Sequence, residues 1–290
     1  MNADFKTIGL VGKYNSAGIV GPLRRLAVWL KERGHAVLAT LETVEACDLC
    51  DVPAMALPEM GRQADLAIVM GGDGTMLNVA RTLVEHRVPM IGVNQGRLGF
   101  LADVSLDTMF STLDEMLSGD YIAEERILLD CRMERGDELI LHTYAFNDVV
   151  VSKSTTGRLI EFEVYIDNHF VYSQRADGLV VASPTGSTAY ALSAGGPILH
   201  PTLEAFVLTP ICPHTLSARP IAVNSRSEIE INLIHADDVR VHFDGQRHQD
   251  MRVGDRVIIW RAPNTIRLLH PVGHNYYDTL REKLHWGEKL

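Results

Sequence analysis

A glycine-rich turn between an apolar run and a helical segment constrains this chain more than any other feature. Residues 66–70 (LAIVM) form an uninterrupted apolar run typical of a buried strand, and residues 71–75 (GGDGT) follow at once. A helical pattern begins at residues 76–80. A strand, a glycine-rich turn and a helix N-terminus form a cradle for phosphate, because small residues let backbone N–H groups approach the anion and the helix adds positive partial charge. The turn therefore predicts a phosphate site at the end of a strand.

Asp73 is the unexpected residue of this turn, because a carboxylate in a phosphate cradle repels the ligand. Two roles would explain it: holding a divalent cation, or accepting a proton from an attacking hydroxyl. Either role points to phosphoryl transfer. The structural alternative is a tight turn in which the aspartate caps the next helix. The residues predicted to surround the phosphate are Gly71, Gly72, Gly74 and Thr75.

The first 120 residues alternate between strand and helix patterns. Strands are expected at 7–11, 36–39, 66–70 and 89–93, and helices at 23–31 and 106–117. Strands that alternate with helices predict parallel pairing and a doubly wound α/β sheet. In such a sheet the ligand site lies at the carboxyl ends of the strands, where the glycine-rich turn begins.

From about residue 121 the apolar pattern changes to a period of two. Hairpins are expected over residues 126–144 and 161–172, followed by further strands. A last helical segment at 277–285 is expected to pack back on the first domain. The predicted organisation is an α/β domain over 1–120, joined by 271–290, and an all-β domain over 121–270, most simply a β-sandwich.

Charge and composition exclude some function classes. The formal net charge of −10 argues against a nucleic-acid binder, although it leaves a nucleotide ligand possible. No apolar run approaches the length that spans a bilayer and the start of the chain is polar, so we expect no membrane partner and a cytoplasmic protein. Cys47 and Cys50 have metal-ligand spacing, but no second pair completes a zinc site, so no protein metal site is predicted.

Known phosphate-binding motifs do not match the turn. The chain lacks the Gly-Lys-Ser or Gly-Lys-Thr of a Walker A loop, and Leu77 stands where a dinucleotide fingerprint needs its third glycine. Two other polar clusters are more informative. Asn147 and Asp148 precede the apolar run 149–151, and residues 177–190 lead from a strand into a turn crowded with hydroxyls. These groups can hold ribose and phosphate oxygens, and Tyr190 offers a flat face to a ring, although either cluster alone could be an ordinary turn.

Together these stretches resemble the NAD kinases, and the length looks like that of a bacterial member. The matching segments are 71–75, 94–101, 147–148, 173–178, 183–190 and 213–220, in the family's order. The resemblance implies transfer of the γ-phosphate of ATP to the 2′-hydroxyl of the adenosine ribose of NAD, which gives NADP. It also implies an α/β domain followed by a β-sandwich with a site between them, a divalent cation such as Mg²⁺, and a homo-oligomer, either a dimer or a tetramer.

The resemblance also assigns roles to residues. Asp73 would be the general base, and the triphosphate itself would supply most of the ligands of the cation. The residues implied to bind NAD are Asp73, Gly74, Asn147, Asp148, Arg158, Arg175, Asp177, Thr188, Ala189, Tyr190, Ser193 and Gln246. Many members have Asn-Glu where this chain has Asn147-Asp148, so the carboxylate here reaches one methylene less far.

Other function classes share parts of this pattern. Lipid kinases and phosphofructokinases also carry a Gly-Gly-Asp-Gly phosphate site, but the hydroxyl-rich turn before Tyr190 favours a polar dinucleotide. A non-catalytic NAD-binding regulator is a further alternative. Asp73 argues against it, because pure binding would be better served by glycine or asparagine at that position.

Overall fold

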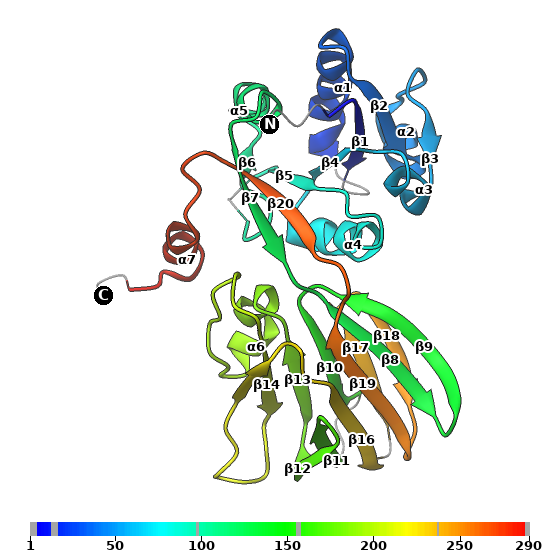
Figure 1. Cartoon of the computed structure of the whole chain (residues 1–290), viewed down its shortest axis with the longest axis vertical. Helices are drawn as coiled ribbons and strands as arrows, with labels where there is room; N and C mark the ends of the chain where they lie inside the picture. The colour runs from blue at the N-terminus through cyan, green and yellow to red at the C-terminus, as the bar shows by residue number, and fades with distance from the viewer. Residues whose placement is uncertain (1–4, 13–16, 97–98, 155–157, 237, 288–290) are drawn as a thin grey trace. The chain divides into compact units, whose positions relative to one another are not determined.

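The structure is a computed structural model that describes residues 5–12, 17–96, 99–154, 158–236 and 238–287. The chain divides into two compact units, one of residues Met1–Glu125 with Ile266–Leu290 and the other of residues Arg126–Thr265. The first unit is an α/β domain that includes the C-terminal helix, and the second is an antiparallel β-sandwich (Figure 1). The predicted fold class is confirmed.

A mostly parallel sheet forms the centre of the first unit. Its strand order is β3-β2-β1-β4-β5-β20-β7, with β6 paired to β5. The strands are β1 (Thr7–Gly12), β2 (Ala36–Thr40), β3 (Ala54–Met55), β4 (Leu66–Met70), β5 (Met90–Asn94), β6 (Val104–Ser105), β7 (Tyr121–Arg126) and β20 (Ile266–Pro271). The segment from β1 to β5 is parallel throughout and has the order 3-2-1-4-5 of a doubly wound fold.

Helices follow most strands of this sheet. They are α1 (Ala17–Glu32), α2 (Leu41–Cys47), α3 (Leu57–Gly61), α4 (Asp73–Leu83), α5 (Met109–Leu117) and α7 (Tyr276–Leu284). The apolar face of α1 packs through Leu23, Leu26 and Leu30 into a core that also holds Ile8 and Leu10 of β1. Helix α5 begins three residues later than the pattern suggested.

The glycine-rich turn lies at the point where the strand order reverses. Strand β1 pairs with β2 on one side and with β4 on the other, and Gly12 is opposite Met70 at the carboxyl ends of β1 and β4. Helix α4 begins at Asp73, just beyond Met70. Open α/β sheets bind ligands at such a reversal, so the tertiary structure puts the predicted phosphate turn where a ligand is expected.

The boundaries of the first unit differ from the predicted ones. The sequence placed residues 121–126 and 266–270 in the all-β domain, because both segments have strand patterns. The structure instead adds β7 and β20 to the edge of the α/β sheet, where β20 pairs parallel to β5 through Leu268 and Met90. Alternation shows that a segment is a strand, but it does not show which sheet the strand joins.

The second unit consists of two six-stranded sheets. One has the order β15-β14-β13-β10-β17-β18 and the other the order β12-β11-β16-β19-β8-β9. Their strands are β8 (Leu129–Arg135), β9 (Glu138–Ala145), β10 (Asp148–Lys153), β11 (Ile160–Ile166), β12 (His169–Ala176), β13 (Gly178–Ala182), β14 (Ala205–Ile211), β15 (Ile221–Asn224), β16 (Ile229–His235), β17 (Val239–Phe243), β18 (Arg247–Met251) and β19 (Asp255–Arg261).

Both sheets contribute to a single buried core. Val149 of β10, Phe243 of β17 and Phe162 of β11 belong to the same apolar cluster and are fully buried. The predicted hairpin of β11 and β12 is confirmed, and its turn residues Asp167 and Asn168 both have positive φ (51° and 63°). Paired positive φ values are those of a two-residue type I′ turn, which Asp and Asn tolerate.

A short helical segment covers the outer face of the first of these sheets. The 3₁₀ turn η1 (Thr185–Thr188) and helix α6 (Tyr190–Ser193) follow β13. Ala191 of α6 packs with Val150, Val180 and Val207 from the outward face of the sheet. The chain between Ser183 and Ser193 is thereby fixed beside the start of β10, where Asn147 and Asp148 lie. Within the described ranges, no helix has the length and apolar character needed to cross a membrane.

Candidate active site

The carboxylate of Asp73 has a fixed position at the start of α4. Its two oxygens accept hydrogen bonds from the backbone N–H groups of Leu101 (3.0 Å) and Phe100 (3.1 Å). Gly99 is needed for this contact, since a Cβ on that residue would lie 2.3 Å from Asp73 Oδ1. The aspartate is therefore held by a segment far from it in sequence, which the simple turn interpretation does not require.

The other residues of the turn have different roles. The N–H of Gly71 donates to Val93 O (2.9 Å) in the sheet, so this donor serves β4 and β5. The N–H of Thr75 donates to Gly72 O (2.9 Å) and starts the helix. Gly72 stands at the N-cap, and a Cβ there would meet nothing within 4 Å. Because the first N–H groups of a helix have no partner within the helix, the N-terminus of α4 can still receive phosphate.

A pocket of about 380 Å³ in the second unit brings together four of the predicted residues. Asn147 and Asp148 come from the start of β10, and Ala189 and Tyr190 from the start of α6. The remaining lining residues are Val150, Ser152, His242, Asp244 and Gly245. Tyr190 is 45% exposed, so its ring is available to a ligand. Segments far apart in the chain thus form one pocket, whose mainly apolar lining carries a few polar groups and an aromatic wall.

Asp244 holds the polar segment at the start of β10. Its Oδ1 accepts from the N–H groups of Asn147 (2.7 Å) and Asp148 (3.2 Å), and its Oδ2 accepts from Phe146 N (3.1 Å). Its own N–H donates to Asp148 O (3.0 Å). Asp244 has a positive φ of 53° and sits in the turn between β17 and β18 with Gly245. One carboxylate therefore orients three successive peptide groups.

Burial changes the acid–base properties of the pocket. Asp148 is only 4% exposed, and burial together with the nearby Asp244 charge raises the pKa of Asp148 to about 7. Burial also lowers the pKa of His242, as do the neighbouring His248 and Arg240 charges. Asp148 can therefore switch between hydrogen-bond donor and acceptor near neutral pH.

The hydroxyls of the turn after β13 form hydrogen bonds within the protein itself. Ser183 Oγ donates to Phe146 O (2.5 Å), and Ser187 Oγ donates to Pro184 O (2.6 Å) while accepting from Leu199 N (2.9 Å). Thr185 Oγ1 accepts from the buried Arg126 guanidinium (3.1 Å). These hydroxyls hold the turn itself, because its buried backbone groups need partners.

Gly186 in this turn has a steric role. A Cβ at this position would lie 2.0 Å from the backbone oxygen of Asn147. The N–H of Ser183 also donates to Asn147 O (2.9 Å). The turn therefore supports Asn147 from one side while Asp244 supports it from the other. What looked like a set of ligand donors is mainly the support of the pocket.

Other residues predicted to bind NAD lie outside the lining of this pocket. Arg175 borders a separate hollow of about 570 Å³ with His214 and Arg219. Asp177 forms an ion pair with Lys153 (2.6 Å between Nζ and Oδ1). Arg158 and Ser193 are exposed, Thr188 is half-buried, and Gln246 is exposed next to Gly245. The structure thus brings together Asn147, Asp148, Ala189 and Tyr190, but not the whole predicted set.

Sequence reasoning missed Asp244 and His242. The only local signal is an Asp-Gly pair after an apolar strand, which reads as a hairpin turn. That Asp244 faces the peptides of residues 146–148 follows from the pairing of β17 with β10, in which Phe243 is opposite Val149. Such a register between distant strands cannot be read from local sequence.

Comparisons with known proteins agree with this geometry. Residues 8–121 match the ATP-NAD kinase N-terminal domain family, and residues 146–270 match the ATP-NAD kinase C-terminal domain family. The chain is 59% identical to an NAD kinase of Thiobacillus denitrificans over 290 residues, with 100% of both chains covered. It is 53% identical to an NAD kinase of Chromobacterium violaceum over 286 residues, which covers 99% of this chain and 98% of the relative.

Solved structures give the same result. A yeast NADH kinase complexed with NADH has a TM-score of 0.91 and 25% identity, covering 99% of this chain and 89% of the other. An Archaeoglobus fulgidus NAD kinase in complex with ATP has a TM-score of 0.74 and 25% identity, covering 96% and 98%. With a family match over both units and full-length relatives above 50% identity, the chain belongs to the NAD kinase family.

Proposed function

We propose that this member of the NAD kinase family transfers the γ-phosphate of ATP to the 2′-hydroxyl of the adenosine ribose of NAD and so forms NADP. The observation that carries the proposal is the pocket that gathers Asn147, Asp148, Ala189 and Tyr190. Amide, carboxyl and aromatic groups in one concave site suit a nucleoside, which needs ribose contacts and a stacking surface. Membership of the family disfavours a lipid or sugar-phosphate substrate.

Residues of the pocket and residues outside it are proposed to contact different parts of NAD. Asn147 and Asp148 hold the adenosine half of NAD, and Tyr190 packs against a ring. Asp177 and Arg175 serve the nicotinamide half, and Gly74, Thr188, Ser193, Gln246 and Arg158 complete the set of contacts that family resemblance suggests. Asp244 lines the same pocket and positions Asn147, since its carboxylate accepts from the backbone N–H groups of Phe146 and Asn147.

Asp73 is proposed as the general base. The two backbone N–H groups of Phe100 and Leu101 fix the carboxylate, which limits the rotation that would otherwise cost activation entropy. Asp73 takes the proton of the 2′-hydroxyl as the new O–P bond forms, and the bond between the γ-phosphorus and the leaving ADP oxygen breaks. The N-terminus of α4, with Gly72 and Gly74, stabilises phosphate charge.

Magnesium is proposed to arrive with ATP. Each oxygen of Asp73 accepts one backbone hydrogen bond, which fixes the carboxylate and leaves a lone pair on each oxygen for the substrate proton. When bound to the triphosphate, Mg²⁺ neutralises charge that develops on the phosphate oxygens. No residue of the chain is assigned to hold it.

The enzyme is further proposed to act as a homo-oligomer, a dimer or a tetramer, in the cytoplasm. Strand β12 is at the edge of its sheet and carries the exposed side chains Phe170 (57%) and Val171 (38%). Exposed apolar edges favour association with another chain. The four unpaired cysteines fit a reducing compartment, in which ATP and NAD are also found.

The purified protein tests the reaction directly. With ATP, Mg²⁺ and NAD it is expected to form NADP, detected by an NADP-specific dehydrogenase. Parallel reactions with NADH and with polyphosphate define the acceptor and the donor. If no NADP forms with any divalent cation, the kinase assignment is wrong; NAD binding without turnover would instead indicate a regulator.

Two variants test the role of Asp73. Asp73→Asn is expected to lower kcat by about 10²–10⁴-fold while NAD binding survives, because a general base contributes about that factor. Gly99→Ala is expected to lower kcat as well, since its methyl group would displace the Asp73 carboxylate. Near-normal turnover in Asp73→Asn would make the residue a structural part of the turn.

A further inference from the structure

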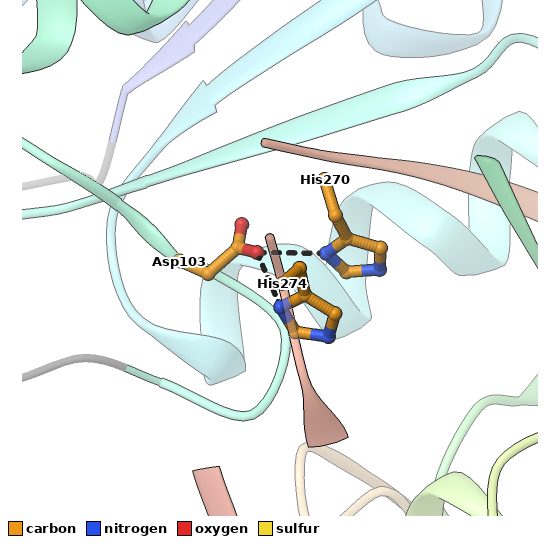
Figure 2. A group of neighbouring side chains, drawn as sticks. All are labelled: Asp103, His270 and His274. Carbon is orange, nitrogen blue, oxygen red and sulfur yellow. Dashed lines mark hydrogen bonds and ion pairs between the residues drawn. The ribbon is translucent and has the colours of Figure 1, made fainter. Parts of the chain in front are cut away.

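A largely buried group of one carboxylate and two imidazoles lies in the first unit, outside the phosphate turn. Asp103 precedes β6, His270 is at the end of β20, and His274 lies just before α7 (Figure 2). The side chains are 7%, 1% and 13% exposed, respectively. Among the described residues this is the one group of three or more potential metal ligands with atoms within 4.8 Å of one another.

The ligand atoms of this group converge on one point. Asp103 Oδ2 lies 2.8 Å from His270 Nδ1 and 2.9 Å from His274 Nδ1. The two rings are stacked with centroids 4.0 Å apart and planes at 13°, so both Nδ1 atoms face the same carboxylate oxygen (Figure 2). Within the described part of the chain, the buried Asp103 Oδ1 and His274 Nε2 have no hydrogen-bond partner. A buried carboxylate with an unused oxygen can ligate a cation through either oxygen or both.

The surroundings of His270 match those of a metal ligand. Its other nitrogen, Nε2, lies 3.3 Å from Glu124 Oε2. Histidines that bind a metal through one nitrogen generally donate the other N–H to a carboxylate, which fixes the orientation of the ring. Glu124 therefore occupies the position of an outer partner, on the far side of the ring from Asp103.

We propose that Asp103, His270 and His274 bind a Zn²⁺ ion that fastens the C-terminal segment of the first unit to the residues preceding β6. Two imidazoles and one carboxylate suit zinc, whereas Mg²⁺ prefers oxygen ligands alone. Zn–N and Zn–O bonds are about 2.0–2.2 Å, so ligand atoms at a tetrahedral ion lie about 3.4 Å apart. The three atoms need to separate by about half an ångström, and the two stacked rings need to tilt so that both in-plane Nδ1 lone pairs point at the ion. The ion replaces the two Nδ1 protons, with water as the fourth ligand.

The site is connected to the catalytic carboxylate through a short piece of backbone. Leu101, whose N–H donates to Asp73, is two residues from Asp103. The N–H of Gly99 donates to Ala102 O (2.9 Å), which closes the turn between them. The ion would therefore stabilise the segment that orients Asp73, although it takes no part in the reaction.

Calorimetric titration of tag-free, EDTA-treated protein with Zn²⁺ tests the proposal. The wild type is expected to bind one equivalent, which His274→Gln loses. Glu124→Gln is expected to bind about 10–100-fold more weakly, the usual effect of removing an outer partner. His142→Gln is the matched control, because His142 contacts the single carboxylate of Asp130 (2.7 Å) and should bind like the wild type.

Cobalt provides a second measurement if a variant does not fold. Co²⁺ bound to the wild type is expected to give intense visible bands of a site with low coordination number, which Zn²⁺ then abolishes. Weak bands like those of the aqueous ion would overturn the proposal. Zn²⁺ affinity in His274→Gln equal to that of the wild type would also overturn it. Neither outcome depends on NADP formation, so the zinc site and the kinase reaction are judged separately.

Discussion

Replacement of Asp244 by asparagine should weaken NAD binding, although Asp244 is not among the residues that the sequence predicts to contact NAD. Asp244 accepts hydrogen bonds from three successive N–H groups, and the shortest, 2.7 Å, is from Asn147. An asparagine side chain offers one acceptor oxygen and a donor NH₂ group. If the oxygen keeps Asn147 and Asp148, the NH₂ group faces Phe146 N and leaves it without an acceptor.

The magnitude follows from the hydrogen bonds that are lost. A hydrogen bond to a charged group contributes about 1.5–3 kcal/mol, and leaving a buried N–H unsatisfied costs about 1–3 kcal/mol. If Asn147 is displaced and the whole of this free energy is lost from NAD binding, the KM for NAD rises by about 10–150-fold, since 1.4 kcal/mol is a factor of ten. Because the displaced Asn147 affects binding of NAD, kcat should change by less than about threefold.

Steady-state kinetics and calorimetry with NAD measure this effect. Asp250→Asn is the control, because Asp250 lies on β18 of the same hairpin but is exposed and pairs with Arg240. A pH profile adds a readout that loss of folding would not give. Removal of the Asp244 charge lowers the pKa of Asp148, so the acid-side loss of NAD affinity should move to lower pH. A KM for NAD within twofold of the wild type would refute the positioning role.

Three further changes test the pocket. Burial and the Asp244 charge raise the pKa of Asp148 to about 7, and the proposed contact with NAD needs its carboxylate form as the acceptor. The kcat/KM for NAD should therefore rise as pH increases through about 7, and Asp148→Asn should give a flat profile over that range; an unchanged profile would contradict this. Gly186→Ala should lower the free energy of unfolding, measured by urea titration, by about 1–3 kcal/mol, because the added Cβ would clash with the Asn147 carbonyl. Gly21→Ala in α1 is the control: its Cβ would have no atom within 4 Å, so the variant should be as stable as the wild type or more stable. Tyr190→Ala should raise the KM for NAD by about tenfold and Tyr190→Phe should not, since the ring provides stacking of about 1 kcal/mol or more; equal KM values for both variants would exclude stacking.

The sequence predicted more of the fold than of the site, for a physical reason. Apolar periodicity reports which face of a segment is buried, so β4, the β11–β12 hairpin and helix α4 could be predicted from local patterns. The assignment of β20 depended on partners far away in the chain, and its pattern fits either sheet. The role of hydroxyls such as Ser187, which donates to Pro184 O, cannot be predicted from sequence, because a donor side chain looks the same whether it binds a ligand or its own backbone.

Local sequence patterns were enough to predict the strand–turn–helix around Asp73, the change from α/β to all-β structure, and the resemblance to the NAD kinases. These depend on short-range patterns and on motif order. Three contacts became visible only in the folded chain: Leu101 N–H with Asp73, Asp244 with the peptide of Asn147, and Asp103 with two histidines from the C-terminal segment. Each of these contacts joins residues brought together by strand order and register, which no local pattern encodes.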